Sequence, residues 1–424
     1  MNWLLKNIVI ILLLLFFIYS LYADYNVYPP DSNYHNEKKL LRTINRMISS
    51  YPSQIKSEIL GVTETDQKEI YLLTIQKDLK KAYRDKPNIL VIGQIHSEEP
   101  IGLEISLKWS EYLLENKKNK LLDYYNFFII PTLNPEGFSI VSQGLSNYHR
   151  KNKKDTNQNG VFDIILDGVD LNRNFPVNWN VEENNNPENR YYAGDYPASE
   201  AETRILMSFF ERKHIFITIS YHSSFNGTYN EKIFFPYNWE EKKSPHYEIM
   251  NDIALKLAKH LPVDYQIDEP GNQNYQVHTQ RTGKVGYLRD YVYKQHHSLS
   301  FDIEVGGINH NGQSVVFPPN KKLAEIINKN IKSLNLMLSD ISKDIHKGLI
   351  VKAGQPLAFK EIIEDSHRKR KALKTNEFGY FFIYSPLNKN NFNIFYDCDI
   401  NKDCRQTFIY NVKNKNTQIF HVKD

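Results

Sequence analysis

Cysteine is almost absent from this chain, with two residues, Cys398 and Cys404, among 424. This scarcity excludes a fold held together by many disulfide bonds and a metal site built from four thiolates. With five residues between them, the two cysteines are expected to form one disulfide bond that closes a local loop and stabilises little beyond it. A metal centre elsewhere in the chain would need histidine and carboxylate ligands.

A large excess of charge of either sign is also lacking. The chain has 53 lysine and arginine residues against 49 aspartate and glutamate residues, which gives a net charge of +4. No stretch interleaves aromatic and basic residues, and the main basic cluster, residues 151–154, is typical of a solvated loop. We therefore expect no nucleic-acid partner. No internal repeat is present either, which excludes a solenoid.

Long apolar runs are confined to the N-terminus, where residues 8–23 follow Lys6. Such a run is short for a membrane-spanning helix and suits the apolar region of a signal peptide. Residues 1–23 are therefore predicted to be a signal peptide or a membrane anchor, the second because Leu21 is not the small residue that cleavage after Ala23 favours. Either alternative predicts a secreted or periplasmic protein, and an uncleaved leader would attach it to the membrane through residues 8–23.

Polar side chains that can bind a metal or accept a proton stand at the ends of three strand-like apolar runs. They are His96 and Glu99 after residues 88–94, His222 after residues 215–221, and Glu304 after residues 298–303. Together they match a catalytic zinc site, in which three protein ligands leave a fourth position for water and a nearby carboxylate accepts a proton from it. We assign His96, Glu99 and His222 as ligands and Glu304 as the general base.

The segment between these runs carries groups suited to a free peptide C-terminus. Arg173 can bind a terminal carboxylate bidentately, with Asn172 beside it as a hydrogen-bond donor. Arg150 provides a cation where the oxygen of an attacked carbonyl group gains negative charge. Asp170 can accept a hydrogen bond from a ligating histidine and so orient its ring. This set favours hydrolysis of the last peptide bond of a chain.

Helical and strand-like segments alternate over most of the chain. Apolar residues recur at helical spacing in five segments: Glu37 to Tyr51, Gly102 to Glu115, Glu200 to Arg212, Tyr247 to Leu261 and Lys321 to Ile341. Because strands alternate with helices, we predict an α/β fold with a mostly parallel mixed central sheet and helices on both faces. Such sheets bind ligands at the carboxyl ends of their strands, where the assigned residues lie.

The order of these motifs resembles that of the zinc metallocarboxypeptidases of the carboxypeptidase A/B family, over about residues 35–343. The matching features are the His96/Glu99 pair, the Asn-Pro-Glu-Gly turn at 134–137, Arg150-Lys151-Asn152, residues 168–175, and the 126-residue gap between His96 and His222. The resemblance implies a catalytic domain over residues 35–343 that uses one zinc ion and acts on peptide or protein C-termini. It implies the same roles for the ligands, the base and the two arginines.

Two positions depart from the family pattern. Digestive members carry an arginine between the first histidine and glutamate ligands, where this chain has Glu98, so one auxiliary contact to the substrate carboxylate is missing. The mobile tyrosine that covers the substrate in the family corresponds to a position near Thr282. Tyr275 or Tyr287 could replace it, but in a chain with 28 tyrosines neither is assigned.

The resemblance also places Arg289 and Asp302 in the pocket for the C-terminal side chain. An arginine would select an acidic side chain, and the two residues together could bind one that carries both charges, such as the diaminopimelate of bacterial cell-wall peptides. The alternative is that Arg289 and Asp302 pair with each other or with neighbours, because buried charges must be paired. Both alternatives stay open at this point.

Residues 155–163, Asp-Thr-Asn-Gln-Asn-Gly-Val-Phe-Asp, have the oxygen spacing of a calcium-binding loop. The glutamate expected at the twelfth position is absent, because Leu166 stands there. The segment is therefore predicted to be an asparagine-rich turn or a structural Ca²⁺ site, from Asp155 to Asp163, that would fix the loop after Arg150.

The sequence pattern changes after residue 345. Short apolar runs separated by turn residues, with no helical segment between them, occur at 348–351, 356–359, 379–384 and 393–396. They predict a small all-β sandwich domain over residues 347–424. This domain resembles the transthyretin-like domain of some carboxypeptidases, and no catalytic constellation falls in it.

Two other functions match part of the pattern. A deacylase or amidase of the aspartoacylase-like branch shares the His-x-x-Glu-Pro and Asp-Leu-Asn-Arg features, but the long gap to His222 and the spacing of Asp290 and Glu304 speak against it. A catalytically inactive module that binds peptide C-termini is the second alternative. The intact ligand set and Glu304 argue against that one.

Overall fold

The computed structural model describes most of the chain beyond the leader. The described residues are 33–423 apart from 117, 180–185, 224–230, 238–242, 264–273, 279–285, 307–319, 367–368, 387–390, 399–403 and 412–415. The predicted leader, residues 1–23, lies outside them. None of the helices in the described ranges has the length and apolar character needed to cross a membrane.

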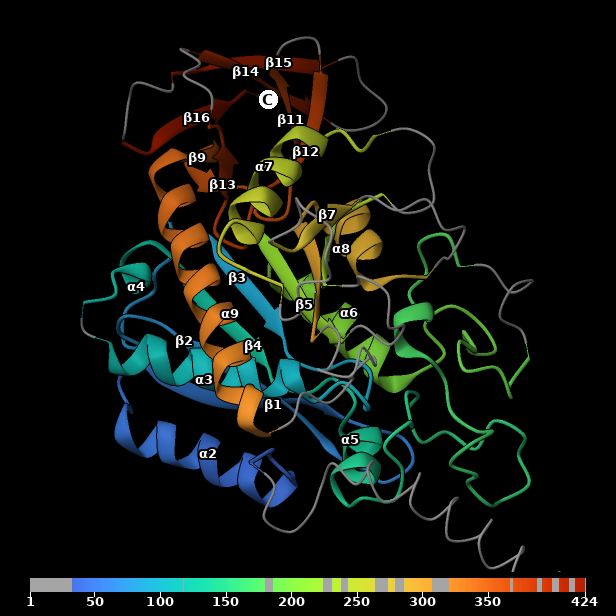
Figure 1. Ribbon diagram of the computed structural model, residues 1–424. Coiled ribbons are helices and arrows are strands. Elements are labelled where there is room, and N and C mark those ends of the chain that lie inside the picture. Colours follow the sequence, from blue (N-terminus) through green and yellow to red (C-terminus); the bar gives the residue numbers. More distant parts are fainter. Residues whose placement is uncertain are drawn as a thin grey trace, which may run out of the picture.

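An eight-stranded mixed sheet forms the centre of the molecule (Figure 1). Its strands are β1 (Ile55–Val62), β2 (Glu69–Ile75), β3 (Asn88–Ile92), β4 (Asn126–Ile130), β5 (Ile217–Ser223), β6 (Lys232–Phe234), β7 (Gln276–His278) and β8 (Leu299–Val305), in the order β1-β2-β4-β3-β5-β8-β6-β7. The central strands β4, β3, β5 and β8 are parallel, whereas β2 and β6 join them antiparallel. The predicted mixed, mostly parallel sheet is confirmed.

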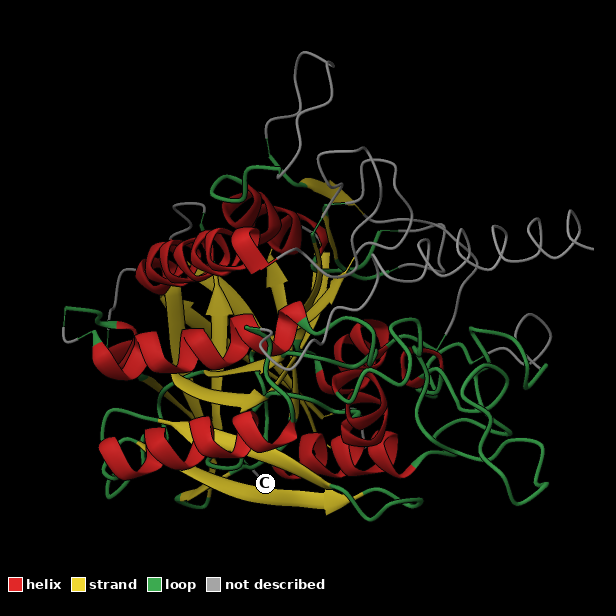
Figure 2. Ribbon diagram, turned by 60° about the horizontal axis from the view of Figure 1, so that its bottom comes forward, coloured by secondary structure: helices red, strands yellow, loops and turns green. Residues whose placement is uncertain are grey.

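Helices cover both faces of this sheet (Figures 1 and 2). One face packs against α2 (Glu37–Ser50), α3 (Ile101–Glu115), α7 (Tyr247–Ala258) and α9 (Asn320–Ile341), and the other against α6 (Ala201–Arg212) and α8 (Leu288–His296). The residues of strand β3 show why both faces of the sheet need a cover of helices. Ile89 and Val91 pack in the first core and Leu90 and Ile92 in the second, because alternate residues of a strand face opposite sides of the sheet.

The five predicted helices are present, and their ends differ from the predicted ones by three residues at most. The Asn-Pro-Glu-Gly segment, interpreted as a turn, instead begins the helix α5 (Pro135–Ser142). The side chain of Asn134 caps this helix by accepting a hydrogen bond from the backbone N–H of Gly137 at 3.0 Å, and Pro135 occupies the first turn, where no partner for its nitrogen is needed. The short helix α4 (Leu121–Tyr124) precedes β4.

The C-terminal strands form two further sheets. The first contains β9 (Ile345–Lys352), β10 (Gln355–Pro356), β13 (Tyr380–Tyr384) and β16 (Gln418–Val422), and the second contains β11 (Glu361–Ser366), β12 (Lys369–Lys374), β14 (Asn391–Cys398) and β15 (Cys404–Asn411). Ile350 and Phe381 of the first sheet share one buried core with Ile362 and Ile394 of the second. The predicted C-terminal β-sandwich is thus present, whereas its boundary at residue 347 and its transthyretin-like character stay predictions.

The predicted disulfide bond would join the last residue of β14 to the first residue of β15. Cys398 and Cys404 are direct partners in the register of this antiparallel pair. Their side chains lie outside the described part of the structure, so the disulfide bond stays a prediction. The predicted run at 356–359 is a strand only at its first residue, because β10 ends at Pro356.

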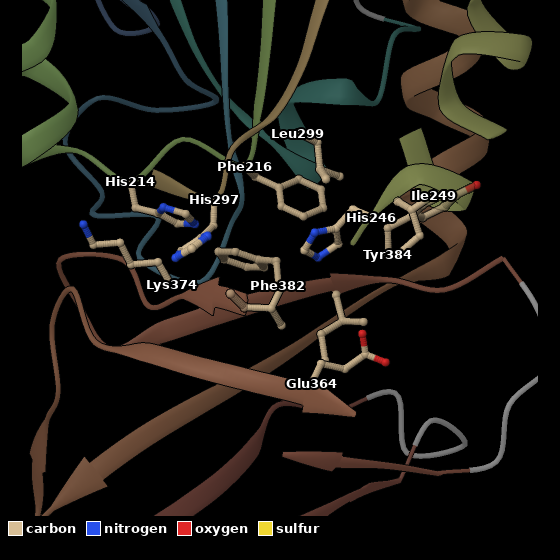
Figure 3. Close-up of a pocket in the computed structure, with 12 residues that line it drawn as sticks. His214, Phe216, His246, Ile249, His297, Leu299, Glu364, Lys374, Phe382 and Tyr384 are labelled. Atoms are coloured by element: carbon tan, nitrogen blue, oxygen red, sulfur yellow. The ribbon is translucent and has the colours of Figure 1, made fainter. Parts of the chain in front are cut away.

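A small cavity separates the amino ends of β5 and β8 from the sandwich (Figure 3). Its free volume of about 20 Å³ has room for about one water molecule. His214, His246 and Glu364 line it, all three are buried, and each has one polar atom without a hydrogen-bond partner among the described residues. Burial lowers the pKa of His214 and of His246 to about 3, and the nearby His297 acts in the same direction on both.

We expect this interface to lose stability on acidification. The folded-state pKa of His214 is about 3, below the value of about 6.5 in an unfolded chain, so its contribution is present above about pH 6.5 and declines as the pH falls towards 3. His297 and Lys374, which line the same cavity, lower the pKa of His214 further. Each such histidine increases the slope of the unfolding free energy against pH by about 1.4 kcal/mol per pH unit.

The measurement is urea unfolding of the wild type and of His214→Gln between about pH 7.5 and pH 5. The variant should show the shallower pH dependence. His421→Gln, on the exposed surface of β16, is the matched control and should behave as the wild type. Equal slopes in wild type and His214→Gln would contradict the assignment.

Candidate active site

The predicted zinc ligands come from the carboxyl ends of β3 and β5. His96 and Glu99 lie in the loop between β3 and α3, which Gln94 closes by donating a hydrogen bond from Nε2 to the Ser97 carbonyl oxygen at 2.8 Å. Gly102 allows α3 to begin against this loop, because a Cβ atom there would lie 1.9 Å from the carbonyl oxygen of Gly93. The loop is thereby held close to the end of the sheet.

His222 and Glu304 lie within strands rather than just after them, because β5 extends to Ser223 and β8 to Val305. The two residues are direct partners in the parallel register of β5 and β8. Adjacent parallel strands present residues of the same register on the same face. The predicted base therefore stands beside the predicted third ligand.

Three ligand atoms form a compact triangle. Nδ1 of His96, Nδ1 of His222 and Oε2 of Glu99 are 3.0, 3.0 and 3.1 Å apart in pairs, and all three residues are buried. With metal–ligand bonds of about 2.0–2.1 Å, two ligands of a tetrahedral zinc ion lie about 3.3 Å apart. In the described part of the chain, these three residues alone form a His/Cys/Asp/Glu group that could hold a metal ion.

The outer nitrogens of both imidazoles have partners that orient the rings. His96 Nε2 lies 3.0 Å from Asp170 Oδ1, and His222 Nε2 lies 3.2 Å from Ser220 Oγ. Because the Asp170 carboxylate can only accept, His96 donates from Nε2 and its Nδ1 lone pair faces the triangle. The predicted role of Asp170 as an orienting carboxylate agrees with these contacts.

The charges around the triangle favour a cation at its centre. Burial acts to raise the pKa of Glu99, but His96 and His222 outweigh it and hold this pKa well below its usual range. Burial acts in the opposite sense on His222, whose pKa Glu99 raises to about 9. A carboxylate anion between two imidazoles attracts positive charge, which a divalent metal supplies. The donor set of two nitrogens and one carboxylate oxygen is one that zinc uses in catalytic sites.

The two predicted arginines converge on Asp170. Arg150 donates from Nε to Asp170 Oδ2 at 2.8 Å, and Arg173 Nη1 lies 3.9 Å from the same oxygen. Burial acts against the charge of Arg150, but Asp170 and Glu99 outweigh it and raise its pKa, so it remains a cation. Nε of the buried Arg173 has no hydrogen-bond partner among the described residues. Both guanidinium groups are thus fixed beside the ligands.

Asn172 links this cluster to helix α8. Its Oδ1 accepts a hydrogen bond from the backbone N–H of Leu288 at 2.9 Å, and its Nδ2 lies 3.5 Å from His222 Nε2. The first turn of α8 is therefore held against the segment that carries Arg173. The structure brings together all of the residues predicted for the metal, the base and the substrate carboxylate.

Two tyrosines border the arginines. The ring of Tyr191, which the sequence reasoning did not single out, lies 5.3 Å from the guanidinium carbons of both Arg150 and Arg173. Tyr287 lies 4.6 Å from Arg173 and 4.2 Å from Arg289. Tyr275 packs in the core instead, and Thr282 lies outside the described residues. Of the two tyrosines considered from the sequence, only Tyr287 lies beside the predicted substrate groups.

Arg289 and Asp302 pair directly. Nη1 of Arg289 donates to Oδ2 of Asp302, and both side chains are buried. Oδ1 of Asp302 has no hydrogen-bond partner among the described residues. The guanidinium group of Arg289 also lies against the rings of Phe234 and Tyr287. The alternative of mutual pairing is therefore the arrangement in the structure, and one acceptor of the pair is left over.

The predicted calcium loop is closed by hydrogen bonds to its own backbone. Asp155 Oδ2 accepts from the Gly160 N–H at 2.8 Å, and Asn159 Oδ1 accepts from the Val161 N–H at 2.8 Å. Asp167 accepts from Thr156 and Asp163 and so completes the loop. These contacts are typical of an asparagine-rich turn. Calcium binding stays a prediction.

The sequence pattern that defines zinc carboxypeptidases matches residues 40–333, more than half of the chain. This protein belongs to the zinc carboxypeptidase family, and His96, Glu99 and His222 are its zinc site. The match covers the whole of the central sheet and every residue of the site described above. It ends before the C-terminal sandwich.

Individual relatives agree with this assignment. The chain is 32% identical to human mast cell carboxypeptidase A over 233 residues, which is 53% of this chain and 52% of that protein. It is 27% identical to human carboxypeptidase O over 240 residues, 55% of this chain and 60% of that protein. The chain therefore spans about half the length of these curated relatives.

Solved structures share the fold. Bovine thrombin-activatable fibrinolysis inhibitor, in complex with tick carboxypeptidase inhibitor, superposes with a TM-score of 0.61 at 22% identity, over 73% of this chain and 98% of that chain. Carboxypeptidase A from Helicoverpa armigera gives 0.62 at 17% identity, over 73% of this chain and 74% of that one. At these identities the likeness shows the fold.

Proposed function

We propose that this protein is an active zinc carboxypeptidase that hydrolyses the C-terminal peptide bond of peptides. The observation that carries the proposal is the arrangement around Asp170. One buried carboxylate orients the ligand His96 and contacts both Arg150 and Arg173. The metal site, the cation for the oxyanion and the cation for the substrate carboxylate are thereby held in one cluster. An exopeptidase that acts on free C-termini needs these three groups in fixed positions.

His96, Glu99 and His222 would hold the zinc ion, which when bound acts as a Lewis acid and makes water a better nucleophile. Glu304 accepts a proton from the attacking water molecule and returns it to the amine of the departing C-terminal residue. Arg150 stabilises the negative charge that develops on the oxygen of the attacked carbonyl group. Arg173 and Asn172 hold the terminal carboxylate, so that only the last peptide bond reaches the reacting groups.

The preference for the C-terminal side chain follows from the Arg289–Asp302 pair. The family resemblance places this pair in the pocket for the C-terminal side chain, and Asp302 retains one acceptor oxygen. A large apolar side chain would bury that oxygen without a partner, which disfavours it. The leftover acceptor of Asp302 suits an ammonium group, and the guanidinium group of Arg289 suits a carboxylate. We propose that a side chain with both charges, such as diaminopimelate in cell-wall peptides, is preferred through both residues, and an acidic side chain through Arg289.

A panel of short peptides that differ only in the last residue tests both levels of this proposal. We expect the zinc-loaded protein to release a single residue, faster from peptides ending in glutamate or diaminopimelate than from those ending in leucine. Equal rates on leucine and glutamate would remove the side-chain preference alone. Equal cleavage of amidated peptides, or release of no residue from any peptide, would remove the carboxypeptidase assignment.

Removal of the metal should abolish this activity. Dialysis against a strong chelator is expected to leave the protein folded, because the three ligands lie on a sheet with two extensive cores, while turnover is lost and returns with stoichiometric Zn²⁺. Residue release is followed by mass spectrometry, and folding by circular dichroism. Full activity in metal-free protein would contradict the assignment of His96, Glu99 and His222.

The N-terminal segment suggests where in the cell the enzyme would act. Residues 8–23 predict export, so the enzyme would meet peptides outside the cytoplasm. Sequencing the N-terminus of the mature protein distinguishes a cleaved signal peptide, with a new terminus after Ala23, from a retained membrane anchor. An intact N-terminus on protein recovered from the cytoplasm would remove the export proposal.

A further inference from the structure

A third arginine borders the site through the residue that departs from the family pattern. Nη2 of Arg190 donates to Oε1 of Glu98, and Nη1 of Arg190 donates to the Tyr148 carbonyl oxygen at 3.2 Å. Nη1 of Arg150 lies 3.6 Å from the same oxygen of Glu98. Two guanidinium groups therefore share one carboxylate oxygen, which places Arg190 next to the cation proposed for the oxyanion.

Glu98 fixes the position of Arg190. Its backbone belongs to the loop of the ligands His96 and Glu99, its side chain is fully buried, and its Oε2 has no hydrogen-bond partner among the described residues. A buried carboxylate left without its cation would be strongly destabilised, so Arg190 is held firmly at this point. The side chain of Arg190 nevertheless remains 28% exposed. Nη1 and Nη2 both donate within the protein, and each carries a second N–H that a substrate oxygen would meet.

Arginines and carboxylates alternate in one row across the site. The successive contacts join Arg173, Asp170, Arg150, Glu98 and Arg190. The ring of Tyr191 lies beside the first two arginines of this row, so the chain segment that carries Arg190 forms part of the wall of the site. A peptide also presents its acceptors in a row, since the terminal carboxylate, the attacked carbonyl group and the next carbonyl group upstream follow one another at about 3.3–3.6 Å per residue.

We propose that Arg190 is a specificity-determining residue that donates a hydrogen bond to the carbonyl group one residue upstream of the attacked one. This inference rests on the carboxypeptidase activity proposed above. In the row, Arg173 takes the carboxylate, Arg150 the oxyanion and Arg190 the upstream carbonyl oxygen. Glu98, an acidic residue where an arginine stands in digestive members, serves to bring a cation from another loop to this place.

Two matched substrates isolate this contact. The first is an acetylated dipeptide with phenylalanine before the preferred C-terminal residue, and the second has phenylpropanoyl in place of acetyl-phenylalanine. They differ only in the upstream amide, and both are uncharged there. We expect the wild type to bind the first with a KM about tenfold lower, because one charge-assisted hydrogen bond is lost with the second.

Arg190→Gln should abolish this difference. The KM for the acetylated substrate should rise about tenfold to that of the phenylpropanoyl substrate. Because Arg150, 3.6 Å from the same oxygen, remains as a cation for Glu98, kcat and zinc content should stay near wild-type values. Arg46→Gln is the matched control, because Arg46 also pairs with a buried glutamate, Glu111, but on α2. It should leave both substrates unaffected. A purely structural role for Arg190 would instead lower the zinc content of the variant, or lower kcat equally for the two substrates.

The outcomes separate the inference from the function on which it rests. If the wild type releases the C-terminal residue from both substrates with equal KM, or if Arg190→Gln weakens both equally, the upstream contact is wrong and the carboxypeptidase activity stands. If the zinc-loaded wild type releases a residue from neither substrate nor from any peptide of the panel, the proposed function itself is wrong.

Discussion

The Glu304→Gln variant is expected to bind zinc and peptide as the wild type does and to lose turnover by about 10²- to 10⁴-fold. Glutamine has nearly the same shape as glutamate but cannot accept a proton from water. The neighbouring His222 keeps its register with residue 304, so the ligand set should be undisturbed. The measurement is kcat on the best peptide of the panel together with zinc content.

Binding without turnover is the decisive feature of this variant. Peptide affinity is measured by calorimetry, which is simplest when no hydrolysis follows. Near-normal kcat in Glu304→Gln would show that another group accepts the proton. Loss of zinc together with activity would leave the role of Glu304 unproven, and Glu304→Asp, which keeps the carboxylate on a shorter side chain, then decides: partial recovery of kcat identifies the proton acceptor.

The Arg173→Met variant is expected to lose about 100-fold in kcat/KM on peptides with a free C-terminus. Methionine keeps much of the apolar volume against Tyr191 and Tyr287 but removes the cation that would bind the carboxylate. The penalty arises because the substrate carboxylate would then enter a buried site without its partner. The measurement is kcat/KM on matched free and amidated peptides.

The comparison of the two peptides separates recognition from folding. The wild type should strongly prefer the free C-terminus, and Arg173→Met should largely lose that preference while its unfolding midpoint changes little. An equal loss on free and amidated peptides would show that Arg173 does not bind the carboxylate. In that case the neighbouring Arg150 becomes the next candidate for this role.

Much of the site could be predicted because its residues stand in local patterns. His96 and Glu99 follow a continuous apolar run that only a doubly buried strand explains, and β3 is buried at every residue. The same reasoning placed His222 and Glu304 at strand ends, although it ended both strands early. The reason is that the prediction ended each run at its candidate site residue, whereas β5 and β8 tolerate polar residues such as Ser220 and Asp302 and continue past His222 and Glu304.

Contacts between distant loops could not be predicted in this way. The pairing of Glu98 with Arg190 joins residues 92 positions apart, and nothing in the local sequence of Arg190 distinguishes it from a surface arginine. Helix α8 was missed because its apolar residues are interrupted by the charged residues Arg289, Asp290 and Lys294.

The strands of the central sheet have two ends with different neighbours. Leu299 at the amino end of β8 borders the cavity beneath the sandwich, and Glu304 five residues further along faces the zinc ligands, a separation of about 17 Å along the strand. The sandwich therefore lies at the end of the sheet away from the zinc ligands. A tether, surface or second protein bound by those C-terminal sheets would therefore leave the zinc ligands facing away from it.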